Sequence, residues 1–147
     1  MEYARHLDAT VEEFFDEMAR TVKRSIQHET GKEVPTSRLD GYRYARTEQD
    51  GRKLVRGKTR VGFKPPRTIE LKHTWPEGVK TIRYVVEPAD EGGIEVTFCE
   101  SFRPKDKTRG VLSGLSDRVY EWDMKRNAKK ALRSIERNIQ ISRGRIS

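Results

Sequence analysis

Three residues with titratable side chains, His73, Tyr84 and Glu100, lie on three successive strand-like stretches of the sequence. An imidazole, a phenol and a carboxylate can exchange protons with a bound molecule or orient its polar group. Alternate residues of a strand share one face, and each of the three falls in register with apolar neighbours. We therefore expect all three side chains to point toward the core or toward the wall of a cavity.

This group of residues has two interpretations. In the first, the side chains orient the polar group of a ligand. In the second, each is an ordinary core residue with a partner, and Glu100 pairs with an arginine or with His73, or lies near the rim. The second situation is the commoner one, because buried polar groups are usually hydrogen-bonded. These three titratable groups, without a further partner visible in the sequence, do not define an acid–base site. We therefore assign no catalytic residue, and an enzyme of the hydrolase or cyclase kind is the weaker expectation.

A ligand site would draw on the inward register of the strands and the apolar side of the last helix. Its expected residues are His73, Trp75, Tyr84, Phe98, Glu100 and Met124. Only 33% of the 147 residues are apolar, which is low for a globular protein. The core should be thin and any cavity small, and bulky side chains such as Phe14, Phe15 and Phe102 can fill the space themselves.

The net charge of +8 comes from the last third of the chain. Residues 1–102 hold 18 basic and 18 acidic residues, whereas residues 103–147 hold 13 basic and 5 acidic residues, a difference of +8. Helical spacing gathers these cations on one side of the last expected helix. The candidate surface for an anion or a partner consists of Trp122, Arg126, Lys129, Lys130 and Arg133.

Several partners fit this basic surface, and a plain solvated helix face fits it as well. Trp122 and Val119 favour packing under the preceding connector or against a second copy in a homodimer, because exposed large apolar residues usually mark an interface. Aromatic rings among cations can also stack on bases. However, Glu121, Asp123 and Glu136 interrupt the positive field. Nucleic acid is therefore the weaker expectation, and other anionic partners stay open.

No motif in the sequence indicates a cofactor or a metal, and we expect neither. The segment Gly57-Lys58-Thr59 resembles the end of a phosphate-binding loop, but five residues rather than four separate Gly51 from Gly57, and the segment has a strand pattern. The three histidines are isolated in sequence, which argues against a metal site. Cys99 is the only cysteine. It falls on an outward register and is expected to be an inert surface thiol.

The beginning of the chain predicts a short strand over residues 3–7 and then a helix with signals at both ends. Thr10 and Glu13 match a capping box, apolar residues then recur every three or four positions, and Gly31 is a typical helix stop. Residues 34–41 predict a connector with room for one helical turn.

Five further strands are expected in the middle of the chain. Short turns containing Gly or Pro separate them, so neighbouring strands should pair antiparallel. In the later strands apolar residues occupy one side and charged residues or Thr the other, which predicts a sheet with one buried and one solvated face. The strands are expected at residues 42–47, 53–63, 68–75, 81–87 and 94–102.

A long helix is expected from residue 116 or 117 to residue 139, after a polar connector over residues 103–114. Its apolar side should cover the sheet. That side consists of Tyr120, Met124, Ala128, Ala131, Leu132, Ile135 and Ile139. The sequence therefore predicts a single domain over residues 1–141 and a frayed tail over residues 142–147.

This order of elements resembles the helix-grip fold of the START-like, or Bet v 1-like (SRPBCC), superfamily. More narrowly, three segments resemble an uncharacterised bacterial domain-of-unknown-function family of that superfamily over about residues 2–140: Thr30-Gly31-Lys32, Leu39-x-Gly41-Tyr42-x-Tyr44 and Thr97-Phe98-x-Glu100. The resemblance implies an α+β fold in which a curved antiparallel sheet of about six strands wraps the C-terminal helix, often with a cavity between them. It assigns no catalytic residue.

Two functions follow from these observations. The first is binding of a small hydrophobic or amphipathic ligand between the sheet and the C-terminal helix. The alternative is a protein or nucleic-acid interaction module that uses the basic C-terminal helix. No run of 18 apolar residues occurs, so we expect no membrane insertion. The first residues lack an apolar stretch of signal-peptide length, so we expect a cytoplasmic protein.

Overall fold

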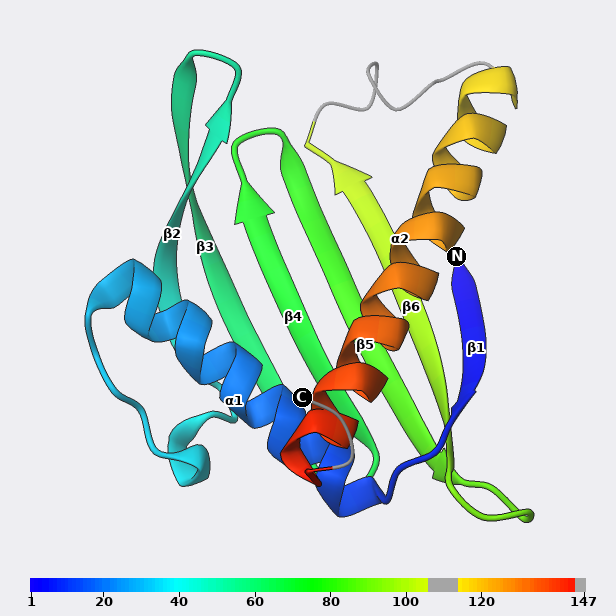
Figure 1. Cartoon of the computed structure of the whole chain (residues 1–147). Helices are drawn as coiled ribbons and strands as arrows, with labels where there is room; N and C mark the ends of the chain where they lie inside the picture. Colours follow the sequence, from blue (N-terminus) through cyan, green and yellow to red (C-terminus); the bar gives the residue numbers. More distant parts are fainter. Residues whose placement is uncertain (106–113, 145–147) are drawn as a thin grey trace.

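The computed structural model describes residues 1–105 and 114–144, with the backbone alone for residue 50 and residues 114–121. The chain forms one six-stranded sheet with two helices across one face (Figure 1). The elements in order are β1 (Glu2–Leu7), α1 (Val11–Thr30), the 3-10 helix η1 (Thr36–Arg38), β2 (Arg43–Asp50), β3 (Lys53–Lys64), β4 (Thr68–Trp75), β5 (Gly78–Pro88), β6 (Ile94–Pro104) and α2 (Gly114–Ser142).

Every strand pairs antiparallel with its neighbours, in the order β1-β6-β5-β4-β3-β2. The short turns between successive strands force this arrangement. The first strand pairs with β6 instead of β2, because α1 carries the chain from one edge of the sheet to the other. The α+β helix-grip plan expected from the sequence is confirmed.

The start and end of α1 follow the expected signals. The Thr10 hydroxyl accepts a hydrogen bond from the Glu13 backbone N–H at 3.0 Å, and the Glu13 carboxylate accepts one from the Thr10 N–H at 2.9 Å. The helix ends at Gly31, which has a φ of 74°, a conformation that glycine adopts without steric cost. The capping box and the glycine stop are both confirmed.

Several strands extend beyond their expected ends. β2 continues to Asp50, β5 begins at Gly78 and β6 continues to Pro104. Backbone pairing runs on into the hairpins, where Gly and Pro had suggested that the strands stop. α2 is longer at both ends than expected, from Gly114 to Ser142. The expected connector falls mostly on residues 106–113, which lie outside the residues that the structure describes.

The core lies between the inner face of the sheet and the two helices. Phe14 and Ile26 on α1, and Leu132 on α2, are fully buried. They pack with inward-facing strand residues such as Ile69 and Val96, which are also fully buried. The expected apolar face of the sheet is thus the face that the helices cover, and burial of these side chains is the main favourable contribution to the fold.

Polar contacts fix the C-terminal half of α2 to the rest of the molecule. Glu136 accepts hydrogen bonds from the Arg5 guanidinium at 3.4 Å and from the Asp8 N–H at 3.1 Å. Arg143 forms an ion pair and hydrogen bonds with Glu13 on α1. Ser142 ends α2, so an ordered chain continues beyond the expected limit of residue 141. Ser142 and Arg143 contact α1 through their side chains, and the frayed tail over residues 142–147 stays a prediction.

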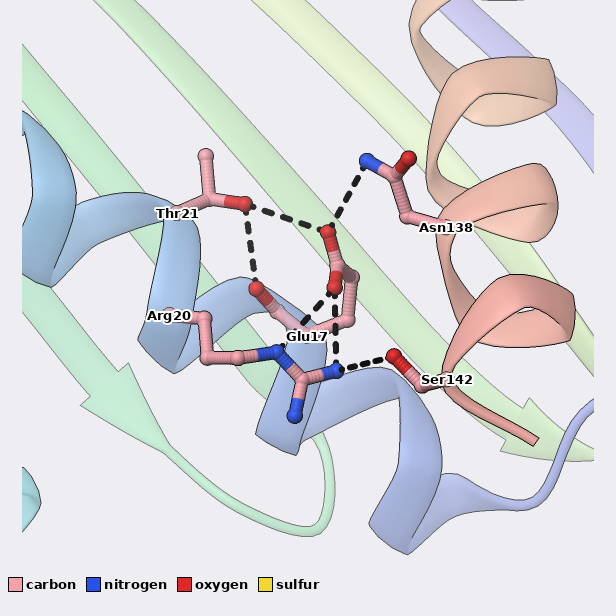
Figure 2. Close-up of polar contacts among 5 residues, drawn as sticks. All are labelled: Glu17, Arg20, Thr21, Asn138 and Ser142. Atoms are coloured by element: carbon pink, nitrogen blue, oxygen red, sulfur yellow. Dashed lines mark hydrogen bonds and ion pairs between the residues drawn. The ribbon is translucent and has the colours of Figure 1, made fainter. Parts of the chain in front are cut away.

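A buried carboxylate joins α1 to α2 (Figure 2). Glu17 is 4% exposed. It accepts hydrogen bonds from Arg20 at 3.0 Å, from Asn138 on α2 at 3.1 Å and from the Thr21 hydroxyl at 3.4 Å. Arg20 also donates to the Ser142 hydroxyl at 3.2 Å. These bonds satisfy a charge whose burial would otherwise be costly.

Candidate functional site

One end of the inner face of the sheet is polar, whereas the rest of that face is apolar. Cross-strand pairing places Tyr44, Thr59, His73 and Lys80 side by side on β2, β3, β4 and β5. We call these four residues the polar row. In the next row the partners are Val61, Leu71 and Ile82, with Glu100 at the β6 end. Beyond that row lies an apolar one, built from Phe63, Ile69, Tyr84 and Phe98.

His73 is held in the neutral form within the polar row. Its Nδ1 lies 2.8 Å from the Thr59 hydroxyl, and both side chains are buried. Burial lowers the pKa of His73 to about 4, with the positive charges of Arg46 and Lys80 acting in the same direction. The imidazole is therefore uncharged at neutral pH and can exchange hydrogen bonds as a dipole.

Glu100 pairs with a lysine rather than with the arginine or histidine expected from the sequence. Its carboxylate lies 3.3 Å from Nζ of Lys80, and its side chain is 9% exposed against 43% for the lysine. The pair thus connects the buried inner face to solvent. Phe102, two residues after Glu100 and opposite Lys80, is 43% exposed.

Tyr84 lies in the aromatic part of the inner face. Its ring centroid is 5.3 Å from that of Phe98 and 6.0 Å from that of Phe14. Burial raises the pKa of Tyr84 to about 12, and the negative charge of Glu100 acts in the same direction. The phenol is therefore a neutral donor and acceptor beside apolar rings.

The three residues His73, Tyr84 and Glu100 share the inner face as predicted, but each has a different partner. Among the described residues, Thr59 bonds to His73, Lys80 pairs with Glu100, and aromatic rings surround Tyr84. No hydrogen bond between described residues joins any two of the three, so they do not form an acid–base cluster.

The remaining expected ligand residues also lie near this inner surface. Trp75 is half-buried at the end of β4, and its ring covers the α-carbon of Gly57 on β3. Phe98 is buried in the apolar row. Met124 on α2 is 4% exposed yet lies outside the continuous apolar core cluster. Whether the six residues bind a ligand stays a prediction.

The outward face of α2 is basic, as the helical spacing indicated. Lys125, Arg126, Lys129, Lys130 and Arg133 are exposed. Trp122 is 62% exposed, and the Arg126 guanidinium lies 5.7 Å from the centre of its ring. Glu136, which seemed to interrupt the positive field, is instead bonded to β1 through Arg5. The side chain of Val119 lies outside the described residues.

Two residues central to this site were not predicted from the sequence. Thr59 appeared only as part of a strand pattern, and Lys80 lay just before the expected start of its strand. The inward direction of Thr59 follows from alternation within the expected strand over residues 53–63. That of Lys80 could have been found by extending the next expected strand but one, residues 81–87, back into its hairpin.

Several other features of the described residues bear on function. Cys99 is half-buried, and burial raises the pKa of its thiol, with the carboxylate of Glu2 acting in the same direction. In residues 1–105 and 114–144 no group of three His, Cys, Asp or Glu side chains could hold a metal ion. Within the same residues no helix is both long and apolar enough to cross a membrane.

A family model decides the relationship of this chain to known proteins. The model of a domain of unknown function, DUF3284, matches residues 1–121, from β1 into the first part of α2. The chain belongs to this family. This agrees with the domain-of-unknown-function family that the sequence segments suggested. A search of the curated proteins found no match.

Solved structures show the same fold at low sequence identity. The Zhui aromatase/cyclase from Streptomyces sp. R1128 is 13% identical, with a TM-score of 0.62 over 95% of this chain and 92% of that one. Ara h 8.0201 is 14% identical, with a TM-score of 0.62 over 95% of both chains. A protein of unknown function from Staphylococcus aureus is 14% identical, with a TM-score of 0.61 over 99% of this chain and 95% of that one. At this identity the likeness establishes the START-like fold.

Proposed function

We propose that this DUF3284 protein binds a small amphipathic molecule between the sheet and α2. The observation that carries the proposal is the change from apolar to polar along the inner face. Tyr84 and Phe98 form the buried aromatic part of this face, and the polar row with Glu100 carries hydrogen-bonding groups one or two rows away. A pocket of mostly apolar surface with a few placed polar groups is typical of small-molecule sites.

The polar groups define the chemistry of the ligand's head. His73 is neutral, and its Nε2 takes part in none of the hydrogen bonds between described residues. Glu100 and Lys80 neutralise each other, so neither charge alone favours a strongly charged ligand. The site therefore favours a hydroxyl, carbonyl or phenol group attached to an apolar body. The ligand's apolar body would lie against Tyr84, Phe98 and Met124.

The relatives of known structure support the same class of function. One solved structure of this fold is named as an aromatase/cyclase. The fold carries no function by itself, so the support comes from the residues of the inner face. Trp75, which covers the polar end next to His73, would limit how far the ligand extends.

The test is native mass spectrometry of protein purified without added ligand, together with uptake of the neutral dye Nile red. We expect an adduct or a saturable dye signal with one site per chain. Glu100→Gln should weaken dye binding several-fold, because it removes the partner of Lys80. Glu95→Gln, on the outward register of the same strand, is the matched control and should leave binding unchanged. Bare protein together with no dye uptake would refute the proposal.

A second candidate function uses the outward face of α2. The supporting observation is Trp122, which is 62% exposed and lies next to Arg126 among further exposed cations. Aromatic residues and arginine are enriched where proteins bind one another. An acidic protein partner would fit this surface. Replacing Arg126, Lys129, Lys130 and Arg133 by Glu should abolish capture of such a partner and leave Nile red uptake intact.

A further inference from the structure

The outer face of the sheet, opposite both helices, carries a hollow with basic walls. The hollow has a volume of about 460 Å³ and lies over β2, β3 and β4. Ala45 and Thr74 are its small outward side chains, and Tyr44 and Thr59, whose side chains are buried, also line it. Its cations are Arg43, Lys58, Arg60 and Lys72, all exposed. We call this feature the outer basic hollow.

The cations of the outer basic hollow have no ion-pair partner among the described residues. Arg43, Arg60 and Lys72 are direct cross-strand neighbours on β2, β3 and β4. None of the four cations forms a side-chain hydrogen bond or an ion pair with another described residue. Like charges directly opposite one another destabilise a sheet. A local arrangement that costs stability without a compensating contact is typical of a functional surface.

The cations continue along β3 at a regular spacing. Arg56, Lys58 and Arg60 alternate with inward residues, so all three lie on the outer face. Outward residues of a strand are separated by about 6.6 Å, twice the rise per residue. This separation is close to that of successive phosphates in an extended nucleic-acid strand. β3 therefore presents a line of positive charges that matches a line of phosphates.

We propose that the outer basic hollow binds a single strand of nucleic acid through its phosphates. The occupant is a narrow anionic chain rather than a planar membrane, because the cations surround a depression with small residues between them. Among the described strands the outward side chains include no Phe, Tyr or Trp on which bases could stack. Binding should therefore be independent of base sequence and strongly dependent on salt. This surface is opposite the ligand site proposed above, and the two proposals stand independently.

The experiment measures fluorescence anisotropy of labelled oligo(dT) and oligo(dA) with the full chain. Strands of about 12 nucleotides are within the usual site sizes of single-strand binders. We expect similar affinity for both oligonucleotides. The slope of log affinity against log salt should be about −3, the value for four phosphate contacts on a single strand.

Charge reversal locates the binding surface. Lys58→Glu with Arg60→Glu should weaken binding at low salt by at least about tenfold and reduce the size of the salt slope by about 1.4, the value for two lost contacts. The matched control is Arg24→Glu with Lys32→Glu, which makes the same change of charge at exposed positions in and just after α1. This control should bind like the unmodified chain, and both variants should keep the same circular dichroism spectrum.

Four results would overturn the proposal. The first is no anisotropy change even at the lowest salt. The second is an equal loss of affinity in the α1 control, which would indicate a response to net charge alone. The third is loss of affinity in Lys129→Glu with Lys130→Glu but not in the β3 variant, which would place the anion on α2. The fourth is stronger binding to phosphatidylserine vesicles than to either oligonucleotide, which would indicate a membrane surface.

Discussion

Gly57 lies directly beneath the indole ring of Trp75. A Cβ built on Gly57 would stand 2.6 Å from Cζ3 of that ring and 2.7 Å from the carbonyl oxygen of Thr74. Glycine inside a strand normally weakens it, and close approach of another group is the usual reason for its presence. The absence of a side chain at Gly57 therefore allows Trp75 to cover the inner face at the polar end of the sheet.

Gly57→Ala should lower the free energy of unfolding by about 1–3 kcal/mol, because the added methyl group overlaps the ring and the backbone of β4. Urea unfolding at neutral pH measures the change. Gly62→Ala is the matched control on the same strand, where the nearest atom to a new Cβ is 3.5 Å away. That variant should be as stable as the unmodified chain. Equal stability of both variants would show that the indole ring can move away without cost.

The fold could be predicted from the sequence because its signals are local. The Thr10 capping box, the Gly31 stop and the alternation of apolar residues each act within one element. Short turns then leave antiparallel pairing as the only connection for most strands. The contact of Arg143 with Glu13, a residue 130 positions earlier, could not be predicted, because no local pattern encodes it.

The site could be predicted only in part, because strand register is not visible in the sequence. Inward placement of His73 and Glu100 followed from alternation. The partner of Glu100 depends on the register, which places Ile82 opposite Glu100 and Lys80 diagonally across from it. The outer basic hollow is not visible in the net charge of the sequence. Residues 1–102 carry no net charge, yet folding places Lys58 and Arg60 on the outer face, whereas acidic residues such as Glu12 lie on α1.

His73 should make the protein less stable in mild acid. Its folded-state pKa is about 4, below the value of about 6.5 for an unfolded chain. Between these two values the unfolded state binds the proton and the folded state does not, so stability falls as pH drops from about 6.5 to 4 and this contribution levels off below that. The loss is at most roughly 3 kcal/mol.

Two measurements check the His73 prediction. Titration of its ring by NMR should give a midpoint near 4. Urea unfolding of His73→Gln should then show a weaker decline in stability over the same pH range than the unmodified chain. A ring midpoint between about 6 and 7, the ordinary range for histidine, would contradict the burial argument.

Glu17 should contribute strongly to the attachment of α2. Glu17→Ala removes the acceptor for Arg20, Thr21 and Asn138 (Figure 2). We expect a loss of about 2 kcal/mol in unfolding free energy, typical for hydrogen bonds to a buried charge. The matched control is Asp16→Ala, at the adjacent exposed position, which should change stability little. If both substitutions cost the same, the charge of α1 and not the buried network would be responsible.

The outer basic hollow should reduce stability, and relieving its repulsion should raise it. Arg60 lies between Arg43 and Lys72 on the neighbouring strands. Arg60→Thr removes both unfavourable pairs and adds a β-branched side chain, so thermal unfolding at low salt should show a gain of about 0.2–1 kcal/mol per relieved pair. The gain should shrink as salt screens the charges.

Arg83→Thr is the matched control for the repulsion, because Arg83 lies on the same outer face but opposite Glu70. Its removal deletes an attractive pair instead of a repulsive one, so the same chemical change should leave stability equal or lower. We expect the two substitutions to change stability in opposite directions, and only Arg60→Thr to weaken oligonucleotide binding. These results together would link the cost in stability to the binding surface. If Arg60→Thr is destabilising at low salt, repulsion among the cations of the hollow does not reduce stability, and the argument from repulsion fails.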